Sequence, residues 1–197
     1  MPLPPVTRVD ALRLKLRPLA AADLPDLLEV NGDPEVTRFL PYETWQSLAD
    51  AEAWLVRMET MAASGTGQVL VLERRSDAKV IGDLLLFKYD EGSRRIELGY
   101  VLGRVHWGKG LMREAITAAC ACAFDELGIR RIEAEVNPEN LASCALLLKV
   151  GFALEGRLRK RWEAKGNAYD TNIYGWLAED RLAAGAGRQG SDHGRSE

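Results

Sequence analysis

The sequence has 197 residues and contains no hydrophobic run long enough to span a membrane. Its N-terminus, MPLPPVTRVD, is short and rich in proline and lacks the pattern of a secretory signal peptide. The formal net charge is only −3, which argues against a general nucleic-acid binder. We therefore expect a cytoplasmic protein with no membrane or nucleic-acid partner.

Motifs for metals and redox chemistry are also missing. Cys120, Cys122 and Cys144 form no CxxC motif and no Cys/His spacing. Cys120 and Cys122 are two positions apart in a helical run, which points their side chains away from each other. No group of His, Cys, Asp and Glu has the spacing of metal ligands. We expect reduced, mostly buried thiols and no metal site.

The common nucleotide-binding motifs are absent. GxGxxG is excluded because the position three after Gly110 is Arg113, and the Walker pattern GxxxxGK[ST] does not occur. The glycines at positions 108 and 110 therefore do not belong to a dinucleotide-binding fingerprint or to a P-loop.

The composition that is present is that of a globular domain, with 47% hydrophobic and 28% charged residues. The length fits a single domain, which we place at residues 1–182. Residues 183–197, AAGAGRQGSDHGRSE, are small, polar and rich in glycine, and we expect them to form a flexible tail.

The first half of the chain has the pattern of an antiparallel meander. Alternating or apolar segments predict strands, and short turns such as SDAK and DEGS join three of them. Apolar residues at helical spacing predict two helices before these three strands, the second with Ser47 and Asp50 as an approximate capping box. The predicted strands are 12–19, 67–75, 80–89 and 94–102.

The second half predicts a strand–helix–strand crossover. A long helix over 110–127 separates the strand at 94–102 from a strand at 130–136, and a crossover of this kind makes two strands parallel neighbours. A helix at 140–150 and two further strands complete the chain. The fold class is α/β, with a mixed sheet that is antiparallel at first and parallel at its centre, and with helices on both faces.

The stretch HWGKGLMREA places two glycines where a strand passes into a helix. A helix N-terminus carries unpaired N–H groups and partial positive charge, so it can bind an anion. Gly108 and Gly110 leave room for a phosphate beside the backbone, and Lys109 can add charge. The alternative is that both glycines serve only a tight turn.

Four segments in this order resemble the GNAT acetyltransferases, in particular the ribosomal-protein N-terminal acetyltransferase (RimJ/RimL-like) branch. WGKGLMREA resembles the pyrophosphate loop of that family, although Val105 stands where Gln or Arg is usual. ELGYVL resembles the strand that pairs with pantetheine, Asn137 to Gly156 resembles the N-x-x-N-x-x-S…GF-x-x-EG pattern, and AYDTNIYGW resembles the last strand. The resemblance extends from about Leu12 to Leu177.

The resemblance implies acetyl transfer from acetyl-CoA to an amine by direct attack on the thioester. It implies that phosphates accept hydrogen bonds from the backbone N–H groups at the glycine loop, and that pantetheine pairs with the strand before it. The two parallel strands would have to splay apart to admit that chain. The cofactor-binding residues would be Tyr100, Val101, Leu102, Gly108, Lys109, Gly110, Leu111, Met112, Asn140 and Ser143.

An amine acceptor arrives mostly protonated, so a base must remove a proton. Glu97 is the first candidate, because a carboxylate in mid-strand is unfavourable unless paired or hydrated. A structural pair with Arg95, two residues away on the same strand face, is the alternative. Glu163 is a weaker candidate. By the resemblance, relatives can carry the base on the hairpin after the EG motif, but the corresponding position here is Trp162, one residue before Glu163 and on the other strand face.

The departing thiolate needs a proton donor. Many GNAT enzymes use a tyrosine at the position that is Leu147 here, so the resemblance points instead to Ser143, one turn earlier. Asn140 lies three residues before it, on nearly the same helix face. A helix cap and a first-turn hydroxyl are the structural alternative for this pair, and both roles are compatible.

Other conspicuous residues carry weaker hypotheses. We expect His106 to be a solvent-facing loop residue. The basic segment RLRKRW, residues 157–162, is expected to be a solvated strand face, although it could receive an acidic peptide or the adenosine 3′-phosphate. Four apolar side chains of the early helical region could pack in the core or line the acceptor cleft: Trp45, Trp54, Met58 and Met61.

The acceptor remains open at this stage. The leading hypothesis is an N-acetyltransferase acting on the α-amine of a peptide or protein, and the alternative is a small amine such as a polyamine, an amino acid or an antibiotic. A non-catalytic acyl-CoA-binding module is a second class, consistent with Leu147 but not with Glu97 and Ser143. A nucleic-acid binder using residues 157–162 would show strongly salt-dependent binding. A homodimer built through an edge strand is also open.

Overall fold

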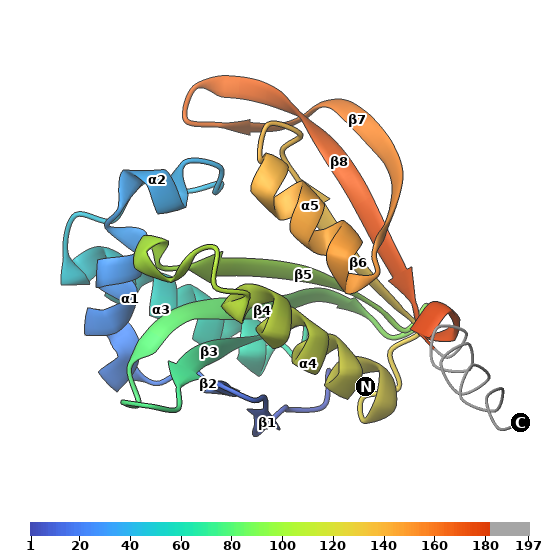
Figure 1. The fold of residues 1–197 in the computed structure, drawn as a ribbon, viewed down its shortest axis with the longest axis horizontal. Helices are drawn as coiled ribbons and strands as arrows, with labels where there is room; N and C mark the ends of the chain where they lie inside the picture. The colour runs from blue at the N-terminus through green and yellow to red at the C-terminus, as the bar shows by residue number, and fades with distance from the viewer. Residues whose placement is uncertain (182–197) are drawn as a thin grey trace, which may run out of the picture.

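The computed structural model describes residues 1–181, so the predicted tail at 183–197 lies outside the described residues. One eight-stranded sheet, in the order β1-β2-β3-β4-β5-β6-β8-β7, runs through the molecule (Figure 1). Its strands are β1 Val9–Asp10, β2 Leu14–Pro18, β3 Gln68–Arg74, β4 Val80–Asp90, β5 Arg95–Leu102, β6 Arg131–Val136, β7 Ala153–Ala164 and β8 Asn167–Leu177. The helices are α1 Leu24–Asn31, α2 Pro34–Thr37, α3 Leu48–Ala63, α4 Leu111–Asp125 and α5 Leu141–Val150, with short 3-10 turns at Ala21–Asp23 and Arg104–His106.

The strands β3, β4 and β5 form the antiparallel meander that the turns predict, and β2 and the unpredicted β1 extend it at one edge. Each pairs with its predecessor in an antiparallel ladder, and the ladder between β4 and β5 aligns Leu84 with Tyr100 and Phe87 with Glu97. Between Phe87 and Asp90 the register shifts at a bulge. This part of the sequence prediction is confirmed, with the strand ends moved by one or two residues.

The crossover through α4 makes β5 and β6 the parallel pair, as predicted. Their pairing covers only the start of both strands, from Arg95 opposite Arg131 to Glu97 opposite Glu133. Beyond Glu97, β6 pairs with β8 on its other side, and no described strand pairs with the facing edge of β5. The two strands therefore diverge at Glu97 and leave residues 98–102 with a free edge.

Helices cover both faces of the sheet, as predicted (Figure 1). The larger core joins α4 and α5 to one face, on which Ile96, Leu98 and Ile132 are buried. The smaller core joins α1 and α3 to the other face of β3 and β4, and Trp45 and Trp54 are buried in it. Met58 and Met61 pack against this second core, so the packing role of these four side chains is the one the structure supports.

Helix ends follow from local chemistry. The Asp50 carboxylate accepts a hydrogen bond from Ser47 N–H at 3.0 Å, which is half of the predicted capping box. Gly128, just beyond α4, has φ +65°, a conformation that glycine adopts without steric cost. None of the helices within residues 1–181 is long and apolar enough to cross a membrane.

The cysteines are free thiols, with Cys120 and Cys122 buried and Cys144 half-buried. Burial raises the pKa of the Cys122 thiol to about 11, so it stays protonated at neutral pH. In the part of the chain that the structure describes, no three His, Cys, Asp or Glu side chains are grouped as a metal site.

Candidate functional site

The glycine loop adopts a backbone that only glycine accepts easily. Gly108 has φ +72° and Gly110, the residue that caps α4, has φ +73°. A Cβ added at Gly108 would meet no atom within 4 Å, and one at Gly110 would lie 3.7 Å from Arg13 Nη2. Crowding by protein atoms therefore does not explain these glycines, and the space beside them is open to a ligand.

The N–H groups of residues 108–113 find no acceptor among residues 1–181, and the first helical hydrogen bond runs from Glu114 N to Gly110 O at 3.1 Å. The side chains of Leu111 and Met112 are buried in the core, so only their N–H groups are available to a ligand. A consecutive run of free donors at a helix N-terminus is suited to the oxygens of a phosphate or pyrophosphate.

Arg13 supports this loop from a distant part of the chain. Its Nη1 donates to the Lys109 carbonyl at 2.9 Å, and its Nε donates to Glu114 Oε2 at 2.8 Å. Lys109 Nζ donates to the Val105 carbonyl at 2.8 Å, which places its charge beside the loop backbone. Sequence reasoning missed Arg13, because nothing in a strand-end residue indicates which loop it will contact.

The free edge of β5 lies next to the glycine loop. Trp107 Nε1 donates to the Leu102 carbonyl at 2.7 Å, so this carbonyl is engaged within the protein. The Val101 side chain packs with Val30 of α1 and Val36 of α2, whereas Tyr100 faces the core of α4 and α5. The backbone between Leu98 and Val101 is thus the part of the edge available to an extended chain.

Ser143 and Asn140 meet at the start of α5. Asn140 Oδ1 accepts a hydrogen bond from Ser143 N at 3.1 Å, so the predicted helix cap is present. The Ser143 hydroxyl oxygen lies 2.6 Å from that of Tyr100 on β5. Burial raises the pKa of the Tyr100 phenol above its ordinary value, so the phenol keeps its proton at neutral pH. Sequence reasoning gave Tyr100 a backbone role only, because a strand pattern does not show what a side chain reaches.

Glu97 is buried at the point where β5 and β6 diverge. Burial raises the pKa of its carboxyl, while the Lys88 ammonium opposes that rise. Lys88 Nζ donates to Glu97 Oε2 at 2.7 Å, and Arg95 instead pairs with Glu133 Oε2 at 2.5 Å. The alternative pair of Glu97 with Arg95 is therefore not formed. The bulge brings Lys88 to Glu97, and Arg95 reaches diagonally to Glu133, which the parallel register places opposite Glu97.

A second carboxylate and an indole lie close to this pair. Lys88 Nζ is 3.9 Å from Glu135 Oε1, and Trp162 Nε1 donates to Glu135 Oε2 at 2.6 Å. The Lys88 ammonium lies 5.6 Å from the centroid of the Trp162 ring. Glu163, the weaker candidate base, is exposed one residue further along β7.

His106 is buried, which makes the predicted solvent-facing position wrong. It belongs to the 3-10 turn before the glycine loop, and its Nδ1 has no hydrogen-bond partner among the described residues. Burial lowers the pKa of the imidazole, so the ring is neutral at neutral pH. A loop assignment from sequence could not anticipate that the turn folds inward.

Asp83 is a buried acid that the sequence pattern did not single out. It lies on β4 opposite Val101, and no hydrogen bond from residues 1–181 reaches its carboxylate. Burial raises its pKa to about 7. In the sequence, an acidic residue between apolar strand residues has the pattern of a solvent-facing position, so nothing indicated that Asp83 is buried.

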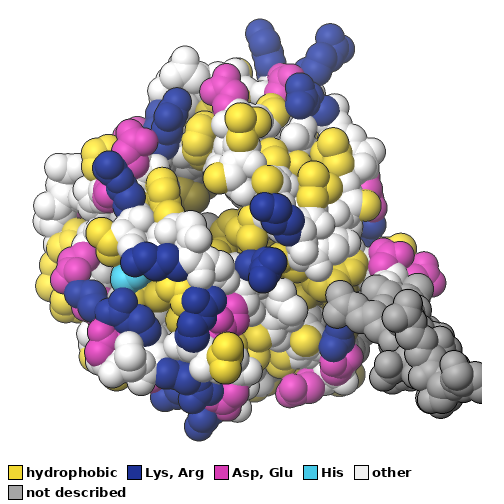
Figure 2. Space-filling view, viewed as in Figure 1, with side chains coloured by type: hydrophobic (Ala, Val, Ile, Leu, Met, Phe, Trp, Pro, Cys, Tyr) yellow, Lys and Arg dark blue, Asp and Glu magenta, His cyan; other side chains and the backbone are white. Residues whose placement is uncertain are grey.

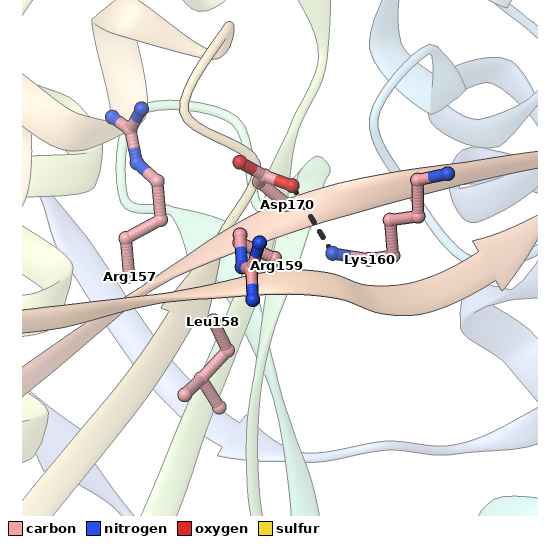
Figure 3. A pocket seen from close by; sticks show the side chains of 5 residues that line it. All are labelled: Arg157, Leu158, Arg159, Lys160 and Asp170. Atoms are coloured by element: carbon pink, nitrogen blue, oxygen red, sulfur yellow. Dashed lines mark hydrogen bonds between the residues drawn. The ribbon is translucent and has the colours of Figure 1, made fainter.

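The basic segment 157–162 is exposed along β7, as predicted. Residues 157–160 line a surface cavity of about 640 Å³ together with Asp170, and the side chains of Arg157 and Leu158 point to opposite sides of the strand (Figure 3). The Lys160 N–H donates to Asp170 Oδ1 at 3.1 Å. Figure 2 shows Lys and Arg side chains interspersed with Asp and Glu on this face of the molecule, without a single-sign patch.

Comparison with known proteins identifies the family. The family described as "Acetyltransferase (GNAT) domain" matches residues 13–153. The chain is 32% identical over 168 residues to the uncharacterized N-acetyltransferase p20 of Bacillus licheniformis, covering 85% of this chain and 94% of p20. It is 33% identical to the uncharacterized N-acetyltransferase YoaA of Bacillus subtilis, covering 86% of this chain and 95% of YoaA.

Solved structures agree in fold. A GCN5-related N-acetyltransferase from Brucella melitensis superposes with a TM-score of 0.82 at 25% identity, covering 96% of this chain and 86% of that one. The divergence of the parallel pair, the glycine loop at the N-terminus of α4 and these matches all agree with the resemblance noted in the sequence. The chain therefore belongs to the GNAT family and is an N-acetyltransferase.

Proposed function

We propose that the protein transfers the acetyl group of acetyl-CoA to the α-amine of a peptide or protein, as a member of the RimJ/RimL-like branch. The observation that carries the cofactor assignment is the run of free N–H groups at residues 108–113, adjoining the free edge of β5. The first feature suits the pyrophosphate, and the second suits the amide groups of pantetheine.

Structural neighbours support this cofactor. RimJ of Mycobacterium smegmatis was solved in complex with CoA-disulfide and superposes with a TM-score of 0.78. A spermidine N-acetyltransferase from Vibrio cholerae was solved with CoA and spermine and superposes with a TM-score of 0.75. A CoA molecule held as we propose would place its thioester at the end of the free edge, beside Glu97.

Proton removal from the acceptor falls to Glu97. Its carboxylate lies at the point of divergence and already contacts an ammonium group, that of Lys88, at hydrogen-bond distance. Because burial raises its pKa, Glu97 is a stronger base than an exposed carboxylate.

Proton delivery to the departing thiolate falls to Ser143, with Tyr100 behind it. The two hydroxyl groups are hydrogen-bonded to each other, so a proton that leaves Ser143 can be replaced from the phenol. This pair takes the role of the tyrosine that many GNAT enzymes have at the position of Leu147. The Leu147 side chain itself is fully buried in the core and has no proton to donate.

The acceptor has a second candidate, a small cationic amine. The carboxylates of Glu97, Glu133 and Glu135 lie on the neighbouring strands β5 and β6. They already pair with side-chain cations, Glu97 with Lys88 and Glu133 with Arg95, so this region accommodates cationic groups. The curated relatives divide in the same way, since they include a putative ribosomal N-acetyltransferase, YdaF of B. subtilis, and spermidine N(1)-acetyltransferase of Escherichia coli, at 28% and 26% identity.

Calorimetric titration with acetyl-CoA, with NAD and ATP as controls, tests the cofactor assignment. Micromolar binding of acetyl-CoA alone is expected, and no binding to the folded protein would exclude the proposal. Release of free thiol in the presence of N-terminal peptides, and separately of polyamines, then identifies the acceptor class. Faster release with polyamines would replace the peptide candidate by the small-amine one.

A further inference from the structure

Lys88 occupies an unusual backbone position at the acceptor end of the site. It lies in the bulge of β4 between Phe87 and Asp90 and has φ +52°, in the left-handed region that non-glycine residues seldom adopt. In a regular strand, Lys88 would point to the face opposite Phe87. The bulge brings its ammonium within 5.2 Å of the centroid of the Phe87 ring.

The surroundings of the Lys88 ammonium are those of a binding site for a cationic amine. Two carboxylates, of Glu97 at 2.7 Å and Glu135 at 3.9 Å, lie beside it. Two aromatic rings, of Phe87 and Trp162, lie within the range of cation–π attraction. Together these groups recognise an alkylammonium ion, and the ion that they hold is a side chain of the protein itself.

We propose that Lys88 is an internal acceptor, which the enzyme acetylates in the absence of an external amine. The inference rests on the proposed function, because it needs acetyl-CoA bound along the free edge of β5. Its own basis is that the Lys88 nitrogen already lies at hydrogen-bond distance from the candidate base, at the strand divergence where the thioester arrives.

The step balances as an ordinary acetyl transfer. Glu97 accepts one proton from the Lys88 ammonium, and the neutral nitrogen attacks the thioester carbonyl carbon. A C–N bond forms and the C–S bond breaks, which releases the CoA thiolate. The thiolate gains a proton from Ser143, and the second proton of the nitrogen passes to solvent and restores the Ser143 hydroxyl. The proton on Glu97 is then released, so the net products are N-acetyl-lysine, CoA and one proton. No oxidant or further reactant is needed.

Accessibility permits the reaction. The Lys88 side chain is 42% exposed, so the acetyl group can reach its nitrogen without unfolding of the sheet. Its flexible four-carbon stem allows the nitrogen to turn from Glu97 toward a carbonyl carbon. Because acceptor and enzyme are one molecule, the effective concentration of the amine is high.

Lys79 provides a matched control within the same chain. Its side chain is 38% exposed, and its Nζ donates to Glu29 Oε2 at 2.7 Å. The two lysines thus have similar exposure and the same ion-pair distance, but Lys79 lies at the opposite end of β4, before Val80. General chemical reactivity toward acetyl-CoA affects both lysines, whereas catalysis at the strand divergence affects only Lys88.

The experiment incubates the purified full-length protein with acetyl-CoA alone and follows acetylation of the two lysines by peptide mass spectrometry. Lys88 is expected to be acetylated at least about tenfold faster than Lys79, with a rate constant independent of protein concentration. The variant Glu97→Gln is expected to lower the Lys88 rate about tenfold or more and to leave the Lys79 rate unchanged. Lys88→Arg, which keeps the cation, should abolish the fast phase.

Equal rates at Lys88 and Lys79, or a Lys88 rate proportional to protein concentration, would overturn the inference. If Lys88 stays unmodified with acetyl-CoA alone, while the same preparation releases thiol once an external amine is added, the inference is overturned and the proposed function stands. Absence of acetyl-CoA binding to the folded protein would remove both. Circular dichroism and thermal unfolding of each variant confirm that it is folded, and Glu97→Asp gives a second test if Glu97→Gln does not fold.

Discussion

The side-chain oxygens of Tyr100 and Ser143 lie 2.6 Å apart and connect the free edge of β5 to the first turn of α5. These residues are far apart in the sequence, Tyr100 on β5 and Ser143 on α5, the helix that follows β6. The contact gives the site a hydroxyl pair where many relatives, by the resemblance, have one tyrosine. It also fixes the position of α5 relative to the edge at which we expect pantetheine.

Replacing Ser143 by alanine is expected to lower kcat roughly tenfold or more, because the thiolate then leaves without a positioned donor. The affinity for acetyl-CoA should change little, since the Asn140 cap accepts from the backbone N–H of residue 143 and survives the change. Steady-state kinetics and calorimetry measure the two quantities. Thr60→Ala, at an exposed hydroxyl of α3, is the control. Unchanged kcat would remove Ser143 as the acid.

Tyr100→Phe tests whether the two hydroxyl groups act as a unit. If they do, kcat of the double variant Tyr100→Phe/Ser143→Ala is little lower than kcat of the more damaging single variant. The reason is that removing one hydroxyl already prevents the other from acting through it. Additive losses in the double-mutant cycle would mean that the two groups act separately.

Gly108→Ala is expected to weaken acetyl-CoA binding about tenfold, equivalent to about 1.4 kcal/mol, because its methyl group enters the space beside the free N–H groups. Gly128→Ala is the matched control, since Gly128 has φ +65° and also no atom within 4 Å of an added Cβ. Both variants should lose about 1 kcal/mol of unfolding free energy through backbone strain. Equal loss of acetyl-CoA affinity in both would contradict the phosphate-cradle assignment.

Glu97→Gln is expected to lower kcat about a hundredfold with an amine acceptor. In the wild type, activity should fall as the pH drops through the pKa of Glu97, since the protonated carboxyl cannot accept a proton. Burial raises that pKa, so the loss begins at a higher pH than for an ordinary glutamate. The acidic limb of the pH–rate profile should be absent in the variant and unchanged in Glu52→Gln, an exposed position of α3. An identical acidic limb in Glu97→Gln would assign it to another group.

Asp83→Asn is expected to stabilise the protein at alkaline pH and to have little effect at acidic pH. The pKa of Asp83 in the folded protein is about 7, against an ordinary value of 3.8 for an aspartate carboxyl, so the folded state holds the proton more tightly. The contribution of Asp83 to stability is therefore complete below about pH 4 and is lost as the pH rises through about 7. The shift corresponds to at most about 4 kcal/mol.

Urea unfolding of the wild type and of Asp83→Asn, each at acidic and at alkaline pH, measures the difference in their free energies of unfolding. Asp77→Asn is a control of opposite sign, because Arg74 holds the pKa of the Asp77 carboxyl at about 2. Its contribution is present above the unfolded pKa and is lost as the pH falls, so Asp77→Asn should weaken the protein only at the higher pH. A pH-independent effect of Asp83→Asn would show that its carboxyl does not titrate between the two conditions.

Local patterns determined much of this protein. Alternation and turn residues specified the meander, the helical run after Gly110 specified the crossover, and that crossover required β5 and β6 to be parallel neighbours. The glycine loop was evident as well, because a positive φ at a helix start is a local requirement that selects glycine. The Asn140 cap is also local, since donor and acceptor are three residues apart.

Tertiary structure alone decided which side chains meet. Glu97 pairs with Lys88 and not with Arg95 because a bulge changes the direction of Lys88, and strand alternation cannot predict where a bulge falls. The contacts of Arg13 with the glycine loop and of Tyr100 with Ser143 join residues distant in sequence. His106 is buried because the turn before α4 folds inward. The sequence by itself thus determined most of the elements, the meander and the parallel crossover. Long-range packing decided the place of β8 between β6 and β7, and also the ion pairs and hydroxyl contacts of the site, because these depend on register and on bulges that the local sequence does not indicate.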